Sequence, residues 1–153
     1  MNALELKVPP LALVLAFAFM MWLAMAQAPA LAFELPARRS IAAFVAGLGA
    51  ALVLAAGLDF RRAGTTVNPT KPQATTSVVD SGVYRLCRNP MYLGFLLGLA
   101  GWATYLSHVL PFLFLPAYVG YMNRFQIAPE ERLLAARFGD GYRQYRLRVR
   151  RWL

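Results

Sequence analysis

The sequence predicts an all-α integral membrane protein: a helical bundle with four transmembrane helices and a C-terminal interfacial amphipathic helix. Hydrophobic residues make up 59% of the 153 residues, and the mean hydropathy of +0.46 is high for a soluble protein. Residues 8–26, 41–58 and 89–123 contain no Asp, Glu, Lys or Arg. Apolar runs of about 18 residues or more are typical of membrane spans. The length fits one domain over residues 1–153.

The first expected span covers residues 8–26. A cleaved signal peptide is the alternative interpretation, because residues 25–28 (Met-Ala-Gln-Ala) resemble a small-residue cleavage site. However, Lys7 beside Glu5 makes a weak positive n-region, and the apolar run is long for a signal peptide. We therefore expect the span to be retained.

The second expected span covers residues 41–58, where Gly47 and Gly49 permit close contact with another helix. A polar connector, residues 59–90, follows on the cytoplasmic side. Its prolines and threonines predict an irregular segment that is long enough to suggest function. Residues 65–69 either cover a binding pocket or belong to a solvated connector.

The next apolar run, residues 91–122, predicts a tight helical hairpin. As one helix, its 32 residues would be about 48 Å long, which exceeds a hydrocarbon core of about 30 Å. A polar Ser-His pair interrupts the run, and two prolines after it disfavour an unbroken helix. We therefore expect two spans, at about 91–107 and 109–127.

The distribution of basic residues favours four spans over three. With four spans, Lys7, five basic residues of the connector and eight arginines from Arg124 onward share one side, 14 in total. Only Arg38 and Arg39 lie on the other side, whereas three spans would separate the arginine-rich tail from the connector. Because basic residues concentrate in cytoplasmic loops, we expect both termini in the cytoplasm and, for a bacterial chain, a location in the inner membrane.

The tail, residues 129–150, is predicted to be a cytoplasmic amphipathic helix at the membrane surface. Spacings of 3, 4, 4, 3 and 4 place six residues on one helical face: Glu131, Leu134, Phe138, Tyr142, Tyr145 and Val149. Gly139 and Gly141 are expected to bend or break this helix. The net charge of +9 suits anionic membrane lipids, at about 1 kcal/mol for each basic residue near the surface, so we expect no nucleic-acid partner.

Metal chemistry is not expected. His108 is the single histidine and Cys87 the single cysteine, so no cluster with metal-ligand spacing exists and no internal disulfide can form. His108 is expected to pack in the hairpin turn, and Cys87 to be a structural residue.

Residues 82–94 (Gly-Val-Tyr-Arg-Leu-Cys-Arg-Asn-Pro-Met-Tyr-Leu-Gly) bring polar groups to the mouth of the third span. Arg88 is a fixed cation whose planar fork suits a carboxylate or phosphate. Pro90 fits the first turn of a helix because it lacks an N–H group. Tyr84 and Tyr92 can stack on a flat ring or donate a hydroxyl. These features are compatible with a ligand site and also with interfacial anchors beside a span.

Glu131 lies on the apolar face of the tail helix, where an unpaired carboxylate is costly. It therefore needs a partner. That partner is either an arginine, Arg88 or Arg85, or the hydroxyls or cation of a ligand.

Two motifs resemble those of the isoprenylcysteine carboxyl methyltransferase and phospholipid methyltransferase superfamily of integral membrane enzymes. Residues 88–94 (Arg-Asn-Pro-Met-Tyr-Leu-Gly), preceded by Gly82-x-Tyr84, are similar to its Arg-His-Pro-x-Tyr-x-Gly motif. Residues 130–149, which begin with Glu-Glu, are similar to its C-terminal signature. The resemblance covers about residues 57–153.

The resemblance implies that S-adenosylmethionine binds in a cytoplasm-facing pocket formed by the hairpin, the connector and the tail, with S-adenosylhomocysteine as product. The implied cofactor-binding residues are Tyr84, Arg88, Asn89, Pro90, Tyr92, Leu93, Gly94, Glu130 and Glu131. The cofactor carboxylate would meet Arg88, its amino group or ribose a glutamate, and its sulfonium the faces of tyrosines. Arg88 and Glu131 are the implied catalytic residues. A small or lipidic methyl acceptor would enter laterally from the membrane.

Asn89 departs from the family motif, which has His at this position. Asn cannot titrate near neutral pH, so a general base at position 89 is excluded and Glu131 remains the candidate base. The acceptor stays open between a carboxylate, an amine and a thiol.

The sequence is compatible with two other functions. In one, the protein is a non-enzymatic membrane module whose basic tail binds anionic lipid or a partner protein. In the other, it is a transporter, which is disfavoured because no ionisable residue lies well inside any expected span.

Overall fold

The computed structural model describes residues 5–64 and 77–153, and over these residues it is all-α, as predicted. Residues 65–69, the predicted pocket cover, lie outside the described residues. Five α-helices form the main elements: α1 (Pro10–Gln27), α2 (Arg38–Arg62), α3 (Pro90–Leu106), α4 (Val109–Tyr121) and α5 (Ala128–Arg148). Within the described residues, three short helical segments join them: η1 (Pro29–Leu31), η3 (Gly82–Arg85) and the π-helical η4 (Met122–Ile127).

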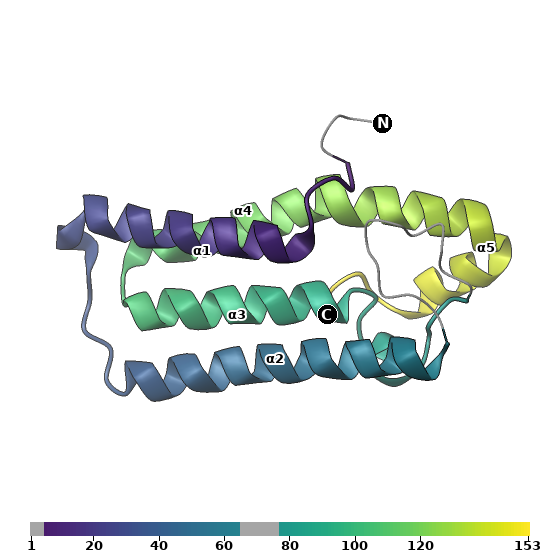
Figure 1. Ribbon diagram of the computed structural model, residues 1–153, viewed down its shortest axis with the longest axis horizontal. Coiled ribbons are helices and arrows are strands. Elements are labelled where there is room, and N and C mark those ends of the chain that lie inside the picture. Colours follow the sequence, from purple (N-terminus) through teal and green to yellow (C-terminus); the bar gives the residue numbers. More distant parts are fainter. Residues whose placement is uncertain (1–4, 65–76) are drawn as a thin grey trace.

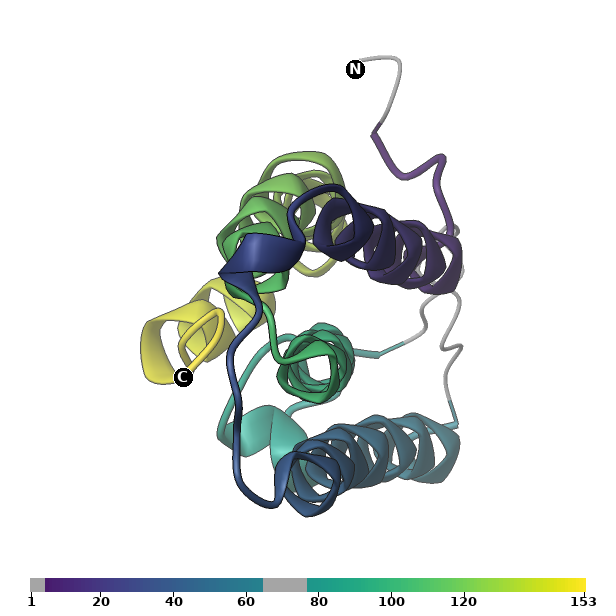
Figure 2. The same cartoon turned by 90° about the vertical axis from the view of Figure 1, so that its left-hand side faces the viewer.

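The helix α3 lies between α2 on one side and the pair α1 and α4 on the other (Figures 1 and 2). Tyr92, Leu99, Tyr118 and Met122 are buried in the main core, where Phe17 packs edge-on against Tyr118 with ring centroids 5.6 Å apart. The central position of α3 brings its first residues into contact with α2, η4 and α5 at that end of the bundle.

Three glycines bring α2 and α3 together, and we call this the glycine contact: Gly49, Gly94 and Gly101. A Cβ atom on Gly49 would lie 2.5 Å from the carbonyl oxygen of Gly94, and one on Gly94 would lie 2.6 Å from that of Gly49. The prediction of close contact is confirmed for Gly49. It is wrong for Gly47, whose Cβ would meet no atom within 4 Å because it faces away from α3.

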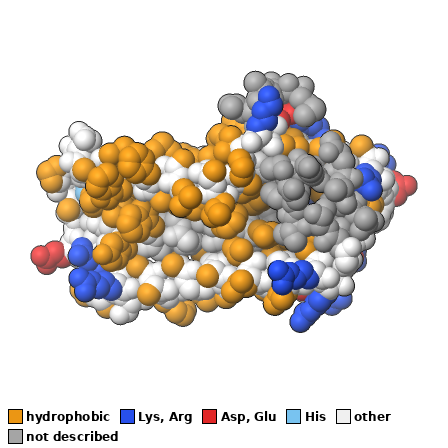
Figure 3. All heavy atoms as spheres, in the orientation of Figure 1, with side chains coloured by type: hydrophobic (Ala, Val, Ile, Leu, Met, Phe, Trp, Pro, Cys, Tyr) orange, Lys and Arg blue, Asp and Glu red, His pale blue; other side chains and the backbone are white. Residues whose placement is uncertain are grey.

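Two of the described helices, α1 and α2, are long and apolar enough to cross a membrane. Large apolar side chains cover the outside of the bundle, including Leu15, Phe44, Leu54 and Leu113, each more than 60% exposed. Figure 3 shows hydrophobic side chains spread over one face of the helices. The helices α3 and α4 have 17 and 13 residues, so the four-span topology stays a prediction.

The hairpin between α3 and α4 turns at His108, as expected. The buried imidazole accepts a hydrogen bond from the Leu110 N–H through Nδ1, at 3.2 Å, and its Nε2 lies 2.7 Å from the carbonyl oxygen of Ala28. This pairing leaves the ring proton on Nε2. His108 therefore caps the N-terminus of α4 and ties the turn to the end of α1.

The helix α4 passes through η4 into α5 without an irregular linker. A bend follows at Gly139, as predicted, where φ is 52° and ψ is −124°. Because of this bend, α5 turns back toward the bundle, and the C-terminus lies beside the start of α3 (Figure 1).

Candidate active site

Both sequence motifs meet at one end of the bundle. The end of α2, η3, the start of α3, η4 and α5 all lie there, and the chain returns to this end through residues 149–153, here called the C-terminal segment (Figure 1). Residues 40 and more apart in sequence are thereby close enough to form one site.

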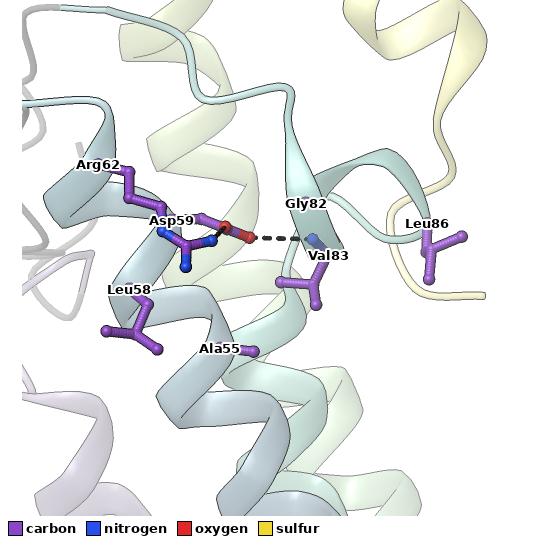
Figure 4. Close-up of a pocket in the computed structure, with 7 residues that line it drawn as sticks. All are labelled: Ala55, Leu58, Asp59, Arg62, Gly82, Val83 and Leu86. Carbon is purple, nitrogen blue, oxygen red and sulfur yellow. Dashed lines mark hydrogen bonds and ion pairs between the residues drawn. The ribbon is translucent and has the colours of Figure 1, made fainter.

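Asp59 fixes the position of η3. Its carboxylate accepts a hydrogen bond from the Val83 N–H at 2.9 Å (Figure 4). Gly82 makes this approach possible: its φ is +55°, and a Cβ atom there would collide with the Asp59 carboxylate. Tyr84 then packs edge-on against Phe60, with ring centroids 5.2 Å apart.

A pocket of about 320 Å³ lies between this end of α2 and η3 (Figure 4). It is lined by Ala55, Leu58, Asp59, Arg62, Gly82, Val83 and Leu86. None of the predicted cofactor-binding residues lines it, so it is not the predicted site.

Glu131 is buried, and its partners are arginines. Arg88 donates to Oε1 at 2.9 Å. Arg151 donates to Oε1 at 3.1 Å and to Oε2 at 2.6 Å, and Arg146 lies 3.9 Å from Oε2. We call this group, Glu131 with Arg88, Arg146 and Arg151, the arginine cluster. Three guanidinium groups around one carboxylate leave an excess of positive charge, which suits an anionic ligand.

One buried nitrogen of the Arg88 side chain meets no acceptor in the part of the chain that the structure describes. The Arg88 side chain is 10% exposed, its NH1 donates to the carbonyl oxygen of Arg146 at 3.3 Å, and its buried Nε has no hydrogen-bond partner among residues 5–64 and 77–153. A buried N–H group without a partner is costly. A ligand acceptor bound at this atom would remove the cost.

Glu130 has a different environment from its neighbour. Tyr92 donates its hydroxyl hydrogen to Glu130 Oε2 at 3.0 Å, and Gln126 donates to the Tyr92 hydroxyl oxygen at 3.4 Å. Burial raises the pKa of Glu130 to about 7; the charge of Glu131 adds to the rise, and the Tyr92 hydrogen bond opposes it. Glu130 therefore changes protonation near neutral pH, a property that Asn89 lacks.

The other predicted residues hold the start of α3 in place. Asn89 donates from Nδ2 to the carbonyl oxygen of Arg151 at 2.9 Å. Pro90 begins α3, and the Leu93 N–H donates to the Asn89 carbonyl oxygen within that helix. Gly94 faces α2 in the glycine contact.

Tyr84 lies in η3, and its carbonyl oxygen accepts a hydrogen bond from the Tyr145 hydroxyl at 2.8 Å. This contact joins η3 to α5. Burial raises the pKa of the Tyr84 hydroxyl far above its usual value, so this group stays protonated.

The sequence interpretation missed Arg146, Arg151 and Gln126. Arg151 follows the end of the helical pattern, and only its charge distinguished it. Within the described residues, no group of three or more His, Cys, Asp or Glu side chains is arranged to hold a metal ion.

The sequence model of the phospholipid methyltransferase family matches residues 37–141. This chain belongs to the phospholipid methyltransferase family. Membership implies a methyltransferase with a lipid-related substrate and, together with α1 and α2, supports membrane association. The match includes residues 82–94 and both glutamates, and it ends before the C-terminal segment.

A relative from Haemophilus influenzae is 46% identical over 63 residues, which are 41% of this chain and the whole of that protein. It is named only as an uncharacterized protein, so it adds no activity to the family assignment. No solved structure matches this chain.

Proposed function

We propose that this family member transfers a methyl group from S-adenosylmethionine to a small or lipidic acceptor at the cytoplasmic face of the inner membrane. The observation that carries the proposal is the arginine cluster, in which Arg88 and Glu131 from two separate motifs meet at one end of the bundle. The Arg88 Nε within it, which has no partner among the described residues, supports an anionic ligand.

The residues fit the chemical groups of the cofactor. Arg88 binds its carboxylate, with Arg146 adding positive charge nearby. Glu130 and Glu131 offer acceptors for its amino group and ribose hydroxyls. When bound, S-adenosylmethionine supplies a methyl group on a sulfonium centre, and the protein's main task is to align donor and acceptor.

Glu130 is better suited than Glu131 to accept a proton. Both Glu131 oxygens already receive hydrogen bonds from arginines, whereas the pKa of Glu130 is raised to about 7. A general base works best when its pKa is near the working pH. An amine acceptor needs such a base, while a carboxylate or thiolate acceptor arrives already ionised.

The four-span topology, with both termini in the cytoplasm, is part of the proposal. The N-terminal residues and α5 are linked at the end of the bundle that holds the site, because Arg132 pairs with Glu5 at 2.9 Å. Arg38 and Arg39 lie at the other end of α2. This asymmetry supports a cytoplasmic site that a lipidic acceptor reaches from the bilayer.

Isothermal titration of the detergent-purified protein with S-adenosylhomocysteine tests the proposal. We expect saturable one-to-one binding, and adenosine, which lacks the carboxylate, should bind much more weakly because it cannot meet Arg88. An absence of binding up to millimolar S-adenosylhomocysteine would exclude the enzyme interpretation. It would favour the non-enzymatic membrane module, which the family assignment otherwise disfavours.

A further inference from the structure

The C-terminal segment lies beyond the region that matches the family, yet it contacts both halves of the site. Its carbonyl groups bind the first motif. The Arg88 N–H donates to the Arg150 carbonyl oxygen at 2.9 Å, and the Asn89 side chain donates to that of Arg151 at 2.9 Å. The Cys87 thiol lies 3.6 Å from the same Arg151 oxygen.

Side chains of the same segment bind the second motif and η4. The Arg151 guanidinium donates two hydrogen bonds to Glu131, one to each oxygen. The Trp152 indole N–H donates to the Asn123 Oδ1 at 3.0 Å. Two consecutive residues therefore connect η4, α5 and the start of α3.

Arg151 limits how many hydrogen bonds Arg88 can give to Glu131. Arg151 uses its fork on both oxygens, so Arg88 gives Glu131 only one hydrogen bond, from NH2. Without Arg151, Glu131 is free to turn and form a two-bond pair with Arg88, which is the preferred geometry of such pairs. That pair would use donors that an anionic ligand needs.

We propose that Arg151 is a positioning residue that keeps Arg88 available to the cofactor carboxylate. Its side chain holds Glu131, and its carbonyl group holds Asn89. This inference rests on the proposed function, because the cofactor is the ligand that Arg88 binds.

Arg151→Met tests this role, with Arg150→Met as its matched control. Both variants lose one positive charge from the same segment, but the Arg150 side chain is exposed, and only its carbonyl group contacts the site. We expect Arg151→Met to weaken S-adenosylhomocysteine binding about tenfold or more, the effect of one lost charged hydrogen-bond pair, and Arg150→Met to change it less than about twofold.

Arg151→Lys separates geometry from charge. Lysine keeps the positive charge but lacks the planar fork, so it cannot hold both Glu131 oxygens in the same way. We expect it to recover only part of the lost affinity. Millimolar guanidinium chloride should restore binding to Arg151→Met and leave Arg150→Met unchanged, a response that a purely structural role would not produce.

Hydrogen exchange provides a readout that needs no cofactor. In Arg151→Met, the Arg88 amide should exchange faster, because the C-terminal segment is released from it; in Arg150→Met it should stay protected. Thermal unfolding checks that both variants are folded. Unchanged affinity and unchanged exchange in a folded Arg151→Met variant would overturn the positioning role alone. A wild-type protein that binds no S-adenosylhomocysteine would overturn the proposed function and the positioning role together.

Discussion

Where α2 meets α3, backbone contacts backbone, whereas at the arginine cluster long side chains from separate segments meet at one carboxylate. The glycine contact depends on the absence of side chains at Gly49, Gly94 and Gly101. The arginine cluster depends on charged groups that would repel one another without Glu131. The first region supports the site, and the second is the ligand site that we propose, so substitutions in the two should affect different measurements.

Substitutions in the arginine cluster should have the largest effect on ligand binding. Arg88→Met removes the donor fork that we assign to the cofactor carboxylate, and Glu131→Gln removes the charge that holds three arginines together. We expect each to weaken S-adenosylhomocysteine binding about 100-fold, the loss of roughly two charged hydrogen bonds, as measured by isothermal titration. Arg143→Met is the control, because Arg143 is 75% exposed and, within the described residues, its ion pair is with the exposed Asp140. Wild-type affinity in either cluster variant would show that Arg88 and Glu131 form a purely structural ion pair.

Substitutions in the glycine contact should instead reduce stability. Gly49→Ala forces the two helices apart, because its new Cβ would lie 2.5 Å from a backbone oxygen. We expect it to lower the free energy of unfolding by about 1–3 kcal/mol, as overpacked cores do, with nearly unchanged affinity below the melting temperature. Gly47→Ala is the matched control on the same helix. It should stabilise the helix slightly, since alanine has the higher helix propensity. A loss of affinity equal to that of Arg88→Met would show that the two regions are not separable.

Glu130 provides a pH test of the site, and it also distinguishes acceptor classes. With its pKa raised to about 7, Glu130 becomes a base as pH rises through neutrality. Methylation of an amine should therefore increase from pH 6 to 8 in the wild type and should be low in Glu130→Gln. Methylation of a carboxylate acceptor should change little over the same range, and equal pH profiles for wild type and variant on an amine would exclude Glu130 as the base.

The same group should make stability depend on pH. The folded pKa of about 7 lies above the ordinary value of 4.5, so the folded protein binds more protons than the unfolded chain between these values. The free energy of unfolding should fall as pH rises from about 4.5 to about 7, by at most about 3 kcal/mol. Glu130→Gln should remove this part of the dependence, as seen by thermal unfolding across that pH range.

The sequence allowed prediction of the features that local patterns determine. Apolar run lengths gave the helices and the hairpin, the tail periodicity put Glu131 on a buried face, and the cost of burying it predicted a partner. In the structure, Arg88 and not Arg85 pairs with Glu131. Arg151 could not be predicted, because it lies beyond Val149, where the periodic pattern of the tail ends, and tertiary contacts alone bring this part of the chain back to Glu131. Gly47 shows the same limit, since the pattern could not tell which face of α2 meets α3.

Substitution of Asp59, which lies near the end of α2 and binds η3, is expected to have the smallest effect on stability. Its carboxylate accepts the Val83 N–H and so fixes η3, which leads into Arg88, but it does not touch the arginine cluster. Asp59→Ala should cost about 1 kcal/mol of stability, the net value of one hydrogen bond, and should weaken S-adenosylhomocysteine binding only about two- to threefold. Asp80→Ala is the control, because Asp80 is 54% exposed and its pairing with Arg148 at 3.4 Å contributes little. If Asp59→Ala weakened binding as much as Arg88→Met, the position of η3 would control ligand binding as directly as the charged groups do. Asp59 would then belong to the binding site and not to its support.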